Sequence, residues 1–199
     1  IGMPMSPEPS LDLDKRAGWP ANLRFFIDRH PRPTWPGHPN LGALSRFWLD
    51  RHAGFRELAA ALENGTTELR EGRLDAAEFQ PWFAPRMGFF LQQLHHHHLI
   101  EDHNYFPVFI AAEPRLKRGF ETLETDHDTL HAAIGELATA SNMLLQALRT
   151  PGADGPRATA HLASAIPSFI GQLGRHLEDE EDLIIPLILE RSEAGLGVG

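Results

Sequence analysis

The sequence predicts an all-α protein: an up-down-up-down four-helix bundle with an irregular, proline-rich N-terminal extension. After residue 40, apolar residues recur at steps of three and four along four long segments, which is the periodicity of amphipathic helices. Turn residues separate these segments, and no stretch shows the convincing alternation of a β-strand. The 199 residues, 42% of them hydrophobic, suit one globular domain with an extension.

Residues 1–40 are the predicted extension. Half of the chain's 16 prolines lie there, so this segment cannot be one long helix. Trp19, Phe25 and Trp35 nevertheless favour burial. We therefore expect an arm that packs on or flanks the bundle, with one short helix near residues 20–29.

The bundle itself is predicted to span residues 41–191, followed by a C-terminal tail at residues 192–199. Asn64-Gly65 is a typical helix-stop signal and should end the first helix. Residues 65–79 would then form the longest connection. The four predicted helices cover approximately residues 41–63, 80–111, 113–149 and 157–191.

Composition excludes several classes of partner. The net charge is −9 and no block of lysine or arginine is present, which argues against nucleic acid and anionic membranes as partners. No apolar run approaches the roughly 18 residues that a transmembrane helix needs. The absence of cysteine removes disulfides and thiolate metal ligands. We expect a cytoplasmic protein, as a monomer or homodimer.

Each predicted apolar helix face is interrupted near its middle by histidine or carboxylate. A buried carboxylate costs several kcal/mol unless it is paired or bound to a metal, and neutral imidazoles cannot offset its charge. The sequence therefore predicts a metal site. Four further histidines are predicted to lie off these faces, namely His95, His96, His98 and His103. The inward groups are His52, His97, Glu101, His127, His131, His176 and Glu180.

The spacing of these groups predicts two metal ions. Six of the seven form pairs at i and i+4, which places two side chains on one helix face within reach of one centre. Five imidazoles and two carboxylates exceed the needs of one four-coordinate zinc, but fit two ions bridged by both carboxylates. Nitrogen and oxygen ligands favour iron, with zinc or manganese as alternatives.

Four segments carry a resemblance to a known family. HHLIEDHNYFP and HLEDEEDLIIP each contain His-x-x-x-Glu, a following acid, and a proline ten residues after the histidine. TDHDTLHAAIGEL supplies His-x-x-x-His, and RHAGFRELAAALE supplies a single histidine. Over about residues 41–191 the chain resembles the haemerythrin-like, or HHE cation-binding, family. The resemblance implies a non-haem, carboxylate-bridged di-iron site.

The two halves of the chain also look like a duplicated helix pair. Aligning His52 with His127 places Arg56 opposite His131, so the two irons should have unequal ligand sets. One iron would take His127, His131 and His176. The other would take only His52 and His97, with both glutamates bridging. In the family, dioxygen or a related small diatomic ligand binds at the open position, and the resemblance implies that Phe55 and Leu173 wall this pocket.

Several functions remain open at this point. In the family, the same site serves dioxygen and iron sensing, storage, and the handling of peroxide or nitric oxide. We expect a metal- and oxygen-binding protein rather than an enzyme. One alternative is a helical interaction module with a purely structural metal. Another is a ferritin-like di-iron oxidase, which requires Glu-x-x-His on two helices. Only Glu124-x-x-His127 fits that pattern.

Overall fold

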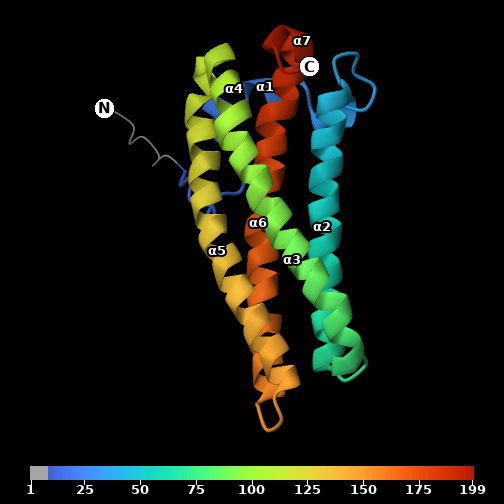
Figure 1. Cartoon of the computed structure of the whole chain (residues 1–199). Helices are drawn as coiled ribbons and strands as arrows, with labels where there is room; N and C mark the ends of the chain where they lie inside the picture. Colours follow the sequence, from blue (N-terminus) through green and yellow to red (C-terminus); the bar gives the residue numbers. More distant parts are fainter. Residues whose placement is uncertain (1–8) are drawn as a thin grey trace, which may run out of the picture.

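The computed structural model describes residues 9–199, and every regular element among them is helical, as predicted. The long helices lie side by side as a helical bundle (Figure 1). The third of the four predicted helices is preceded by the one-turn element η4 (Pro114–Leu116), and the second is continued by η3 (Glu101–Tyr105) and α4 (Phe106–Ala112). The long helices are α2 (Ala43–Arg70), α3 (Ala76–Ile100), α5 (Lys117–Arg149) and α6 (Gly155–Arg191).

The described part of the N-terminal arm contains three short helical elements. These are η1 (Ala21–Leu23), α1 (Phe25–Arg29) and η2 (Arg32–Thr34); residues 1–8 of the predicted arm lie outside the described residues. Trp19 and Phe26 are buried in the same apolar cluster as Trp48 of α2. The arm therefore contributes side chains to the core. A last short helix, α7 (Glu193–Leu196), lies within the predicted tail.

Two helices begin earlier than the sequence pattern suggested, because each has an aspartate cap. The Asp75 carboxylate accepts a hydrogen bond from the Glu78 backbone N–H at 2.8 Å, which starts α3 at Ala76. Asp154 does the same for Arg157 at 3.0 Å at the start of α6. The connections 71–75 and 150–154 are consequently short, and both lie at the lower end of the molecule in Figure 1.

The predicted end of the first helix at Asn64-Gly65 is wrong, because α2 continues to Arg70. Gly65 is buried against the indole ring of Trp82. A Cβ atom at this position would lie 2.4 Å from Cζ3 of that ring. The glycine thus provides room for close packing between α2 and α3 rather than a helix stop.

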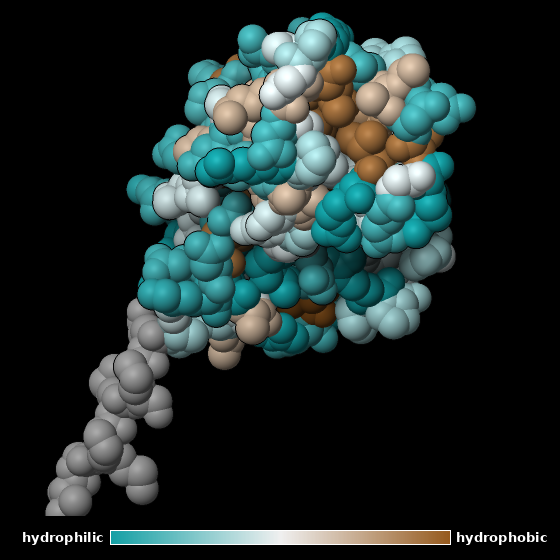
Figure 2. Space-filling model, turned by 90° about the horizontal axis from the view of Figure 1, so that it is seen from below, coloured by the Kyte–Doolittle hydropathy of each residue, from teal (hydrophilic) through white to brown (hydrophobic). Residues whose placement is uncertain are grey.

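The apolar core is divided into clusters along the bundle, with polar groups between them. On α2, Trp48 belongs to one cluster and Phe55 to another, and the buried His52 lies between them. The surface seen along the bundle is mostly hydrophilic, with small hydrophobic areas (Figure 2). Among residues 9–199, every helix is too short or too polar to span a bilayer. The polar groups that divide the apolar core, such as His52 on α2, mark the candidate site.

Candidate metal centre

The polar middle of the bundle gathers imidazole and carboxylate groups from α2, α3, η3, α5 and α6. They form two sets, in each of which one ligand atom from every member lies within 4.8 Å of the others. Glu101 belongs to both sets, so the two are adjacent. Cluster A consists of His52, His97, Glu101 and Glu180, and cluster B of His98, Glu101, His127 and His176.

Two carboxylates reach both clusters. Oε1 of Glu101 lies 2.5 Å from Nε2 of His97, and its Oε2 lies 3.3 Å from Nε2 of His127. Glu180 likewise turns one oxygen to each side, at 3.3 and 3.2 Å from the Nε2 atoms of His52 and His176. Each carboxylate therefore has the orientation of a ligand that bridges two ions.

The histidines in each cluster are also spaced as ligands of one ion. Nε2 of His52 lies 3.1 Å from Nε2 of His97, and the same atoms of His127 and His176 are also 3.1 Å apart. Two nitrogens at metal–ligand distances of 2.0–2.1 Å are separated by about 2.9 to 3.4 Å, depending on the angle at the metal. Both pairs fall within that range.

The buried polar atoms of the centre fit a bound cation. Within the described residues, both oxygens of Glu101 and Oε2 of Glu180 contact imidazole nitrogens without the geometry of a hydrogen bond, and Nε2 of His98 has no hydrogen-bond partner. The two glutamates are 1% and 0% exposed. Leaving carboxylates buried in this way is unfavourable, whereas divalent iron, manganese or zinc would use these nitrogen and oxygen donors.

Three histidines direct their other ring nitrogen to a carboxylate outside the clusters. Such contacts hold the ring in place and increase the basicity of the nitrogen that faces a metal. This arrangement is common around metal-binding histidines. The Nδ1 atoms of His52, His127 and His176 lie 3.0, 2.7 and 3.1 Å from oxygens of Glu181, Asp102 and Asp126, respectively.

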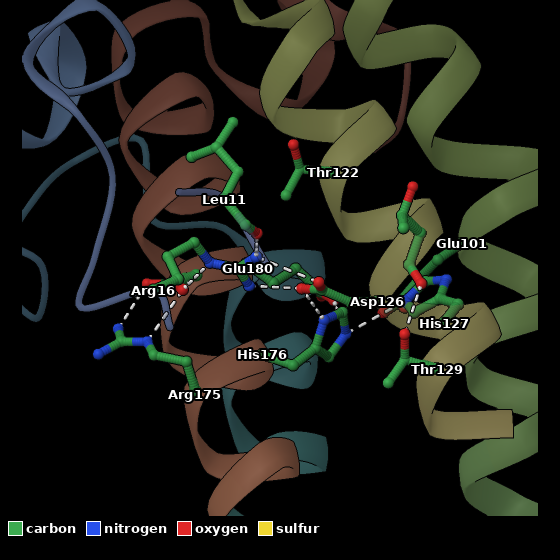
Figure 3. A network of polar contacts seen from close by, with 12 residues as sticks. Leu11, Arg16, Glu101, Thr122, Asp126, His127, Thr129, Arg175, His176 and Glu180 are labelled. Carbon is green, nitrogen blue, oxygen red and sulfur yellow. Dashed lines mark hydrogen bonds and ion pairs between the residues drawn. The ribbon is translucent and has the colours of Figure 1, made fainter. Parts of the chain in front are cut away.

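Arg16 of the N-terminal arm extends this network beside cluster B. Its buried guanidinium donates to Asp126 at 2.5 and 3.1 Å and to Asp179 at 2.6 Å. Arg175 binds Asp179 from the other side at 2.5 and 2.9 Å. Figure 3 shows the resulting row from Arg175 through Arg16 and Asp126 to His176. Two guanidinium groups thus balance two buried carboxylates.

Glu181 beside cluster A has two arginine partners as well. Arg56 of α2 donates to Oε1 at 2.7 Å, and Arg32 of the arm donates to Oε2 at 2.9 Å. Burial alone would raise the pKa of Glu181, but hydrogen bonds from His52 and Arg56 lower it to about 2. This carboxylate is therefore ionised and holds the ring of His52.

The surrounding carboxylates control the protonation of the clusters. Burial alone would lower the pKa of His52, but Glu180 and then Glu181 raise it to about 9. The pKa of His127 is raised to about 10 against burial by Asp102 and Glu101. These two imidazoles carry a proton at neutral pH when no cation is bound, so a metal ion must displace it.

Cluster B contains His98, which the sequence pattern placed off the inward face, and it excludes His131, which the pattern placed on it. His98 was expected off the inward face but is buried, and its ring stacks on His127 with centroids 4.1 Å apart. His97 on the same helix instead contacts His52 of α2. Because α3 packs between α2 and α5, adjacent residues can face the centre from two sides. The adjacent His97 and His98, four and three residues before Glu101, are the sequence signal that could have identified both rings.

The expectation that His131 faces the centre is wrong. The buried positions of α5 near this point are His127, Leu130 and Ile134, and this set excludes position 131. His131 is exposed, and its Nδ1 lies 3.2 Å from Nδ1 of His95. It does not belong to either cluster.

The predicted wall residues Phe55 and Leu173 are both buried in the same apolar cluster. The Phe55 ring packs edge-on against His97, with centroids 5.2 Å apart. A pocket of about 170 Å³ is lined by His97, Glu101 and Tyr105. Cluster A therefore borders both an apolar ring and a small pocket.

Glu101 occupies the first position of a π-helical turn, η3. The Phe106 backbone N–H donates to the Glu101 carbonyl five residues earlier, and the next residue, Pro107, has no N–H to continue an α-helical ladder. Single π-turns occur often at functional sites in α-helices. Here the wide turn lies directly at a ligand shared by both clusters.

Comparison with known proteins identifies the family. No curated protein and no solved structure matches the chain. The family model described as "Hemerythrin HHE cation binding domain" matches residues 43–188, which include α2, α3 and α5 and most of α6. The chain thus belongs to the haemerythrin HHE cation-binding domain family, as the two His-x-x-x-Glu segments indicated.

Proposed function

We propose that this protein is a non-haem di-iron protein that binds dioxygen or another small diatomic ligand in the core of an up-down-up-down four-helix bundle. The observation that carries the proposal is the position of Glu101 and Glu180, each with one oxygen toward each cluster. Family membership supports cation binding at these residues. Nitrogen and carboxylate ligands without thiolate favour iron over softer metals.

The two ions would have unequal ligand sets. In cluster B, His98, His127 and His176 offer three imidazoles, whereas His52 and His97 offer two in cluster A. With the same bridging carboxylates on both sides, the ion of cluster A has fewer protein ligands and an open position. The pocket of about 170 Å³ lined by His97 and Glu101 lies on this side and offers room for a small ligand.

The surrounding residues would keep the site rigid and dry. The Trp48 indole N–H donates to Oε1 of Glu180 at 2.6 Å and fixes that carboxylate. Phe55 on one side and Leu173 in the same apolar cluster would restrict water near the ions. When bound, a pair of ferrous ions supplies the redox chemistry for reversible dioxygen binding. The protein contributes the exclusion of water and the fixed ligand geometry.

The test is the iron content and optical spectrum of protein loaded anaerobically with ferrous iron, before and after exposure to air. We expect about two irons per chain and a new absorption band in air. One zinc and no iron, after loading with either metal, would contradict the proposal. Helical content that depends entirely on the metal would instead favour a purely structural ion.

A matched pair of variants tests the ligand set. His98→Ala should lose iron, since this buried ring faces cluster B, whereas His131→Ala should retain both ions after removal of loosely bound metal. The two residues lie on neighbouring helices, and the second serves as the control. Iron retention in His98→Ala together with loss in His131→Ala would show that the ligand set implied by the sequence is the correct one.

A further inference from the structure

A second arrangement of imidazoles lies on the surface, outside both clusters. His95 of α3 is half-buried and His131 of α5 is exposed. Their Nδ1 atoms are 3.2 Å apart and their ring centroids 4.7 Å apart. The proposed di-iron centre uses neither residue.

The nitrogen separation of this pair is close to that of the histidine pairs in the centre, although here the contact joins Nδ1 rather than Nε2 atoms. Its nitrogen separation of 3.2 Å compares with 3.1 Å for His52 and His97 and 3.1 Å for His127 and His176. All three lie in the range of about 2.9 to 3.4 Å expected for two imidazoles on one ion. The nitrogen separation of the surface pair is therefore compatible with one bound cation.

Both residues are held on rigid elements, and the site is open to solvent. Each lies in the interior of a long helix, and α3 and α5 pack against each other. The two rings also line a groove of about 420 Å³ between these helices. Water can therefore complete the coordination shell of an ion that has only two protein ligands.

The pair is placed one turn from the centre along both helices. His95 precedes the buried His98 by three residues, and His131 follows its stacking partner His127 by four. Exchange of an ion with solvent should be fast at the exposed pair and slow at the buried clusters.

We propose that His95 and His131 form a separate surface site for a divalent transition-metal ion of the borderline class, such as Zn²⁺. Borderline cations prefer neutral imidazole, and a tetrahedral ion would take its two remaining ligands from water. The bound ion would join α3 to α5. This site is independent of the identity of the ions in the centre.

The experiment is a zinc titration, by calorimetry and by thermal unfolding, of protein whose centre is already loaded. We expect about one further rapidly exchanging zinc ion per chain and a higher unfolding midpoint. His95→Ala and His131→Ala should each abolish both effects, and the double variant should lose no more than either single one. His96→Ala, an exposed histidine beside the pair, is the matched control and should behave as the unaltered protein.

Three results would overturn the proposal. The first is an unchanged titration in His95→Ala and His131→Ala, which would mean that the rings only share a proton. The second is an equal loss in His96→Ala, which would mean adventitious binding by surface histidines. The third is loss of a slowly exchanging ion in His131→Ala, which would place this residue in the buried centre. Failure of the di-iron proposal alone would leave the zinc result intact, because the probe at the surface pair is zinc.

Discussion

Replacing Arg16 by methionine should weaken both the fold and the metal centre. Methionine keeps most of the side-chain length but removes the charge and every hydrogen bond. The guanidinium is 0% exposed and lies between the carboxylates of Asp126 and Asp179, themselves 3% and 0% exposed. Asp179 would retain Arg175. Asp126 would be left with His176 alone.

The size of the effect follows from the partners that remain: Asp179 keeps Arg175, whereas Asp126 keeps only His176. Removing one partner of a buried ion pair costs about 3 to 5 kcal/mol, and the remaining arginine on Asp179 favours the lower value, about 3 kcal/mol. For a chain of this size, that corresponds to a decrease of about 6 to 12 °C in the unfolding midpoint. Loosening Asp126, which holds the proposed ligand His176, should weaken metal affinity by about 10- to 100-fold.

Thermal unfolding of the metal-free protein and a chelator competition for the loaded protein measure these two effects separately. Arg24→Met is the matched control, because Arg24 lies in the same arm but pairs with Asp28 at the surface. It should change neither quantity. If Arg16→Met unfolded at the unaltered midpoint and retained the same metal affinity, Arg16 would have no role in the centre.

Three further predictions concern protons, water access and packing. Because the pKa values of His52 and His127 are raised to about 9 and about 10, metal binding at pH 7 should release about two protons and weaken as the pH falls. Calorimetry in buffers of different ionisation enthalpy measures the number of protons released, and equal heats of binding in all buffers would contradict the prediction. Phe55→Ser should retain both irons but admit water and accelerate oxidation of the reduced pair, which stopped-flow absorbance measures. An unchanged rate would mean that we have assigned the open position to the wrong ion. Gly65→Ala should lower stability by about 1 to 3 kcal/mol through overpacking against Trp82, measured by denaturant unfolding, whereas a neutral result would show that the ring moves aside.

Helical periodicity predicted the helical fold, but helix ends required knowledge of neighbouring helices. Asn64-Gly65 has the composition of a helix stop, yet the buried ring of Trp82 uses the missing Cβ for packing. Only the contact between α2 and α3 distinguishes the two uses of glycine. The aspartate caps at Asp75 and Asp154 are local signals that the sequence pattern could have used.

The site was partly predictable because some of its contacts lie within one helix and others depend on neighbouring helices. The i, i+4 spacing brought His97 to Glu101 and His176 to Glu180, because both members of each pair lie on one helix. The same spacing failed for His131, since the buried arc of α5 continues through Leu130 and Ile134. The width of the buried face of a helix depends on the neighbouring helices. The periodicity of a single helix carries no information about them.

The arm contacts have a consequence for the order in which the fold is completed. Arg16 meets Asp126 across 110 residues of chain and Asp179 across 163 residues. During synthesis the arm leaves the ribosome long before either carboxylate exists, and its guanidinium has both partners only after most of α6 has been made. Contacts of such long sequence separation form late and slow folding. Docking of the arm should therefore be among the last steps, and a ribosome-bound chain that ends before position 179 should leave the arm accessible to protease.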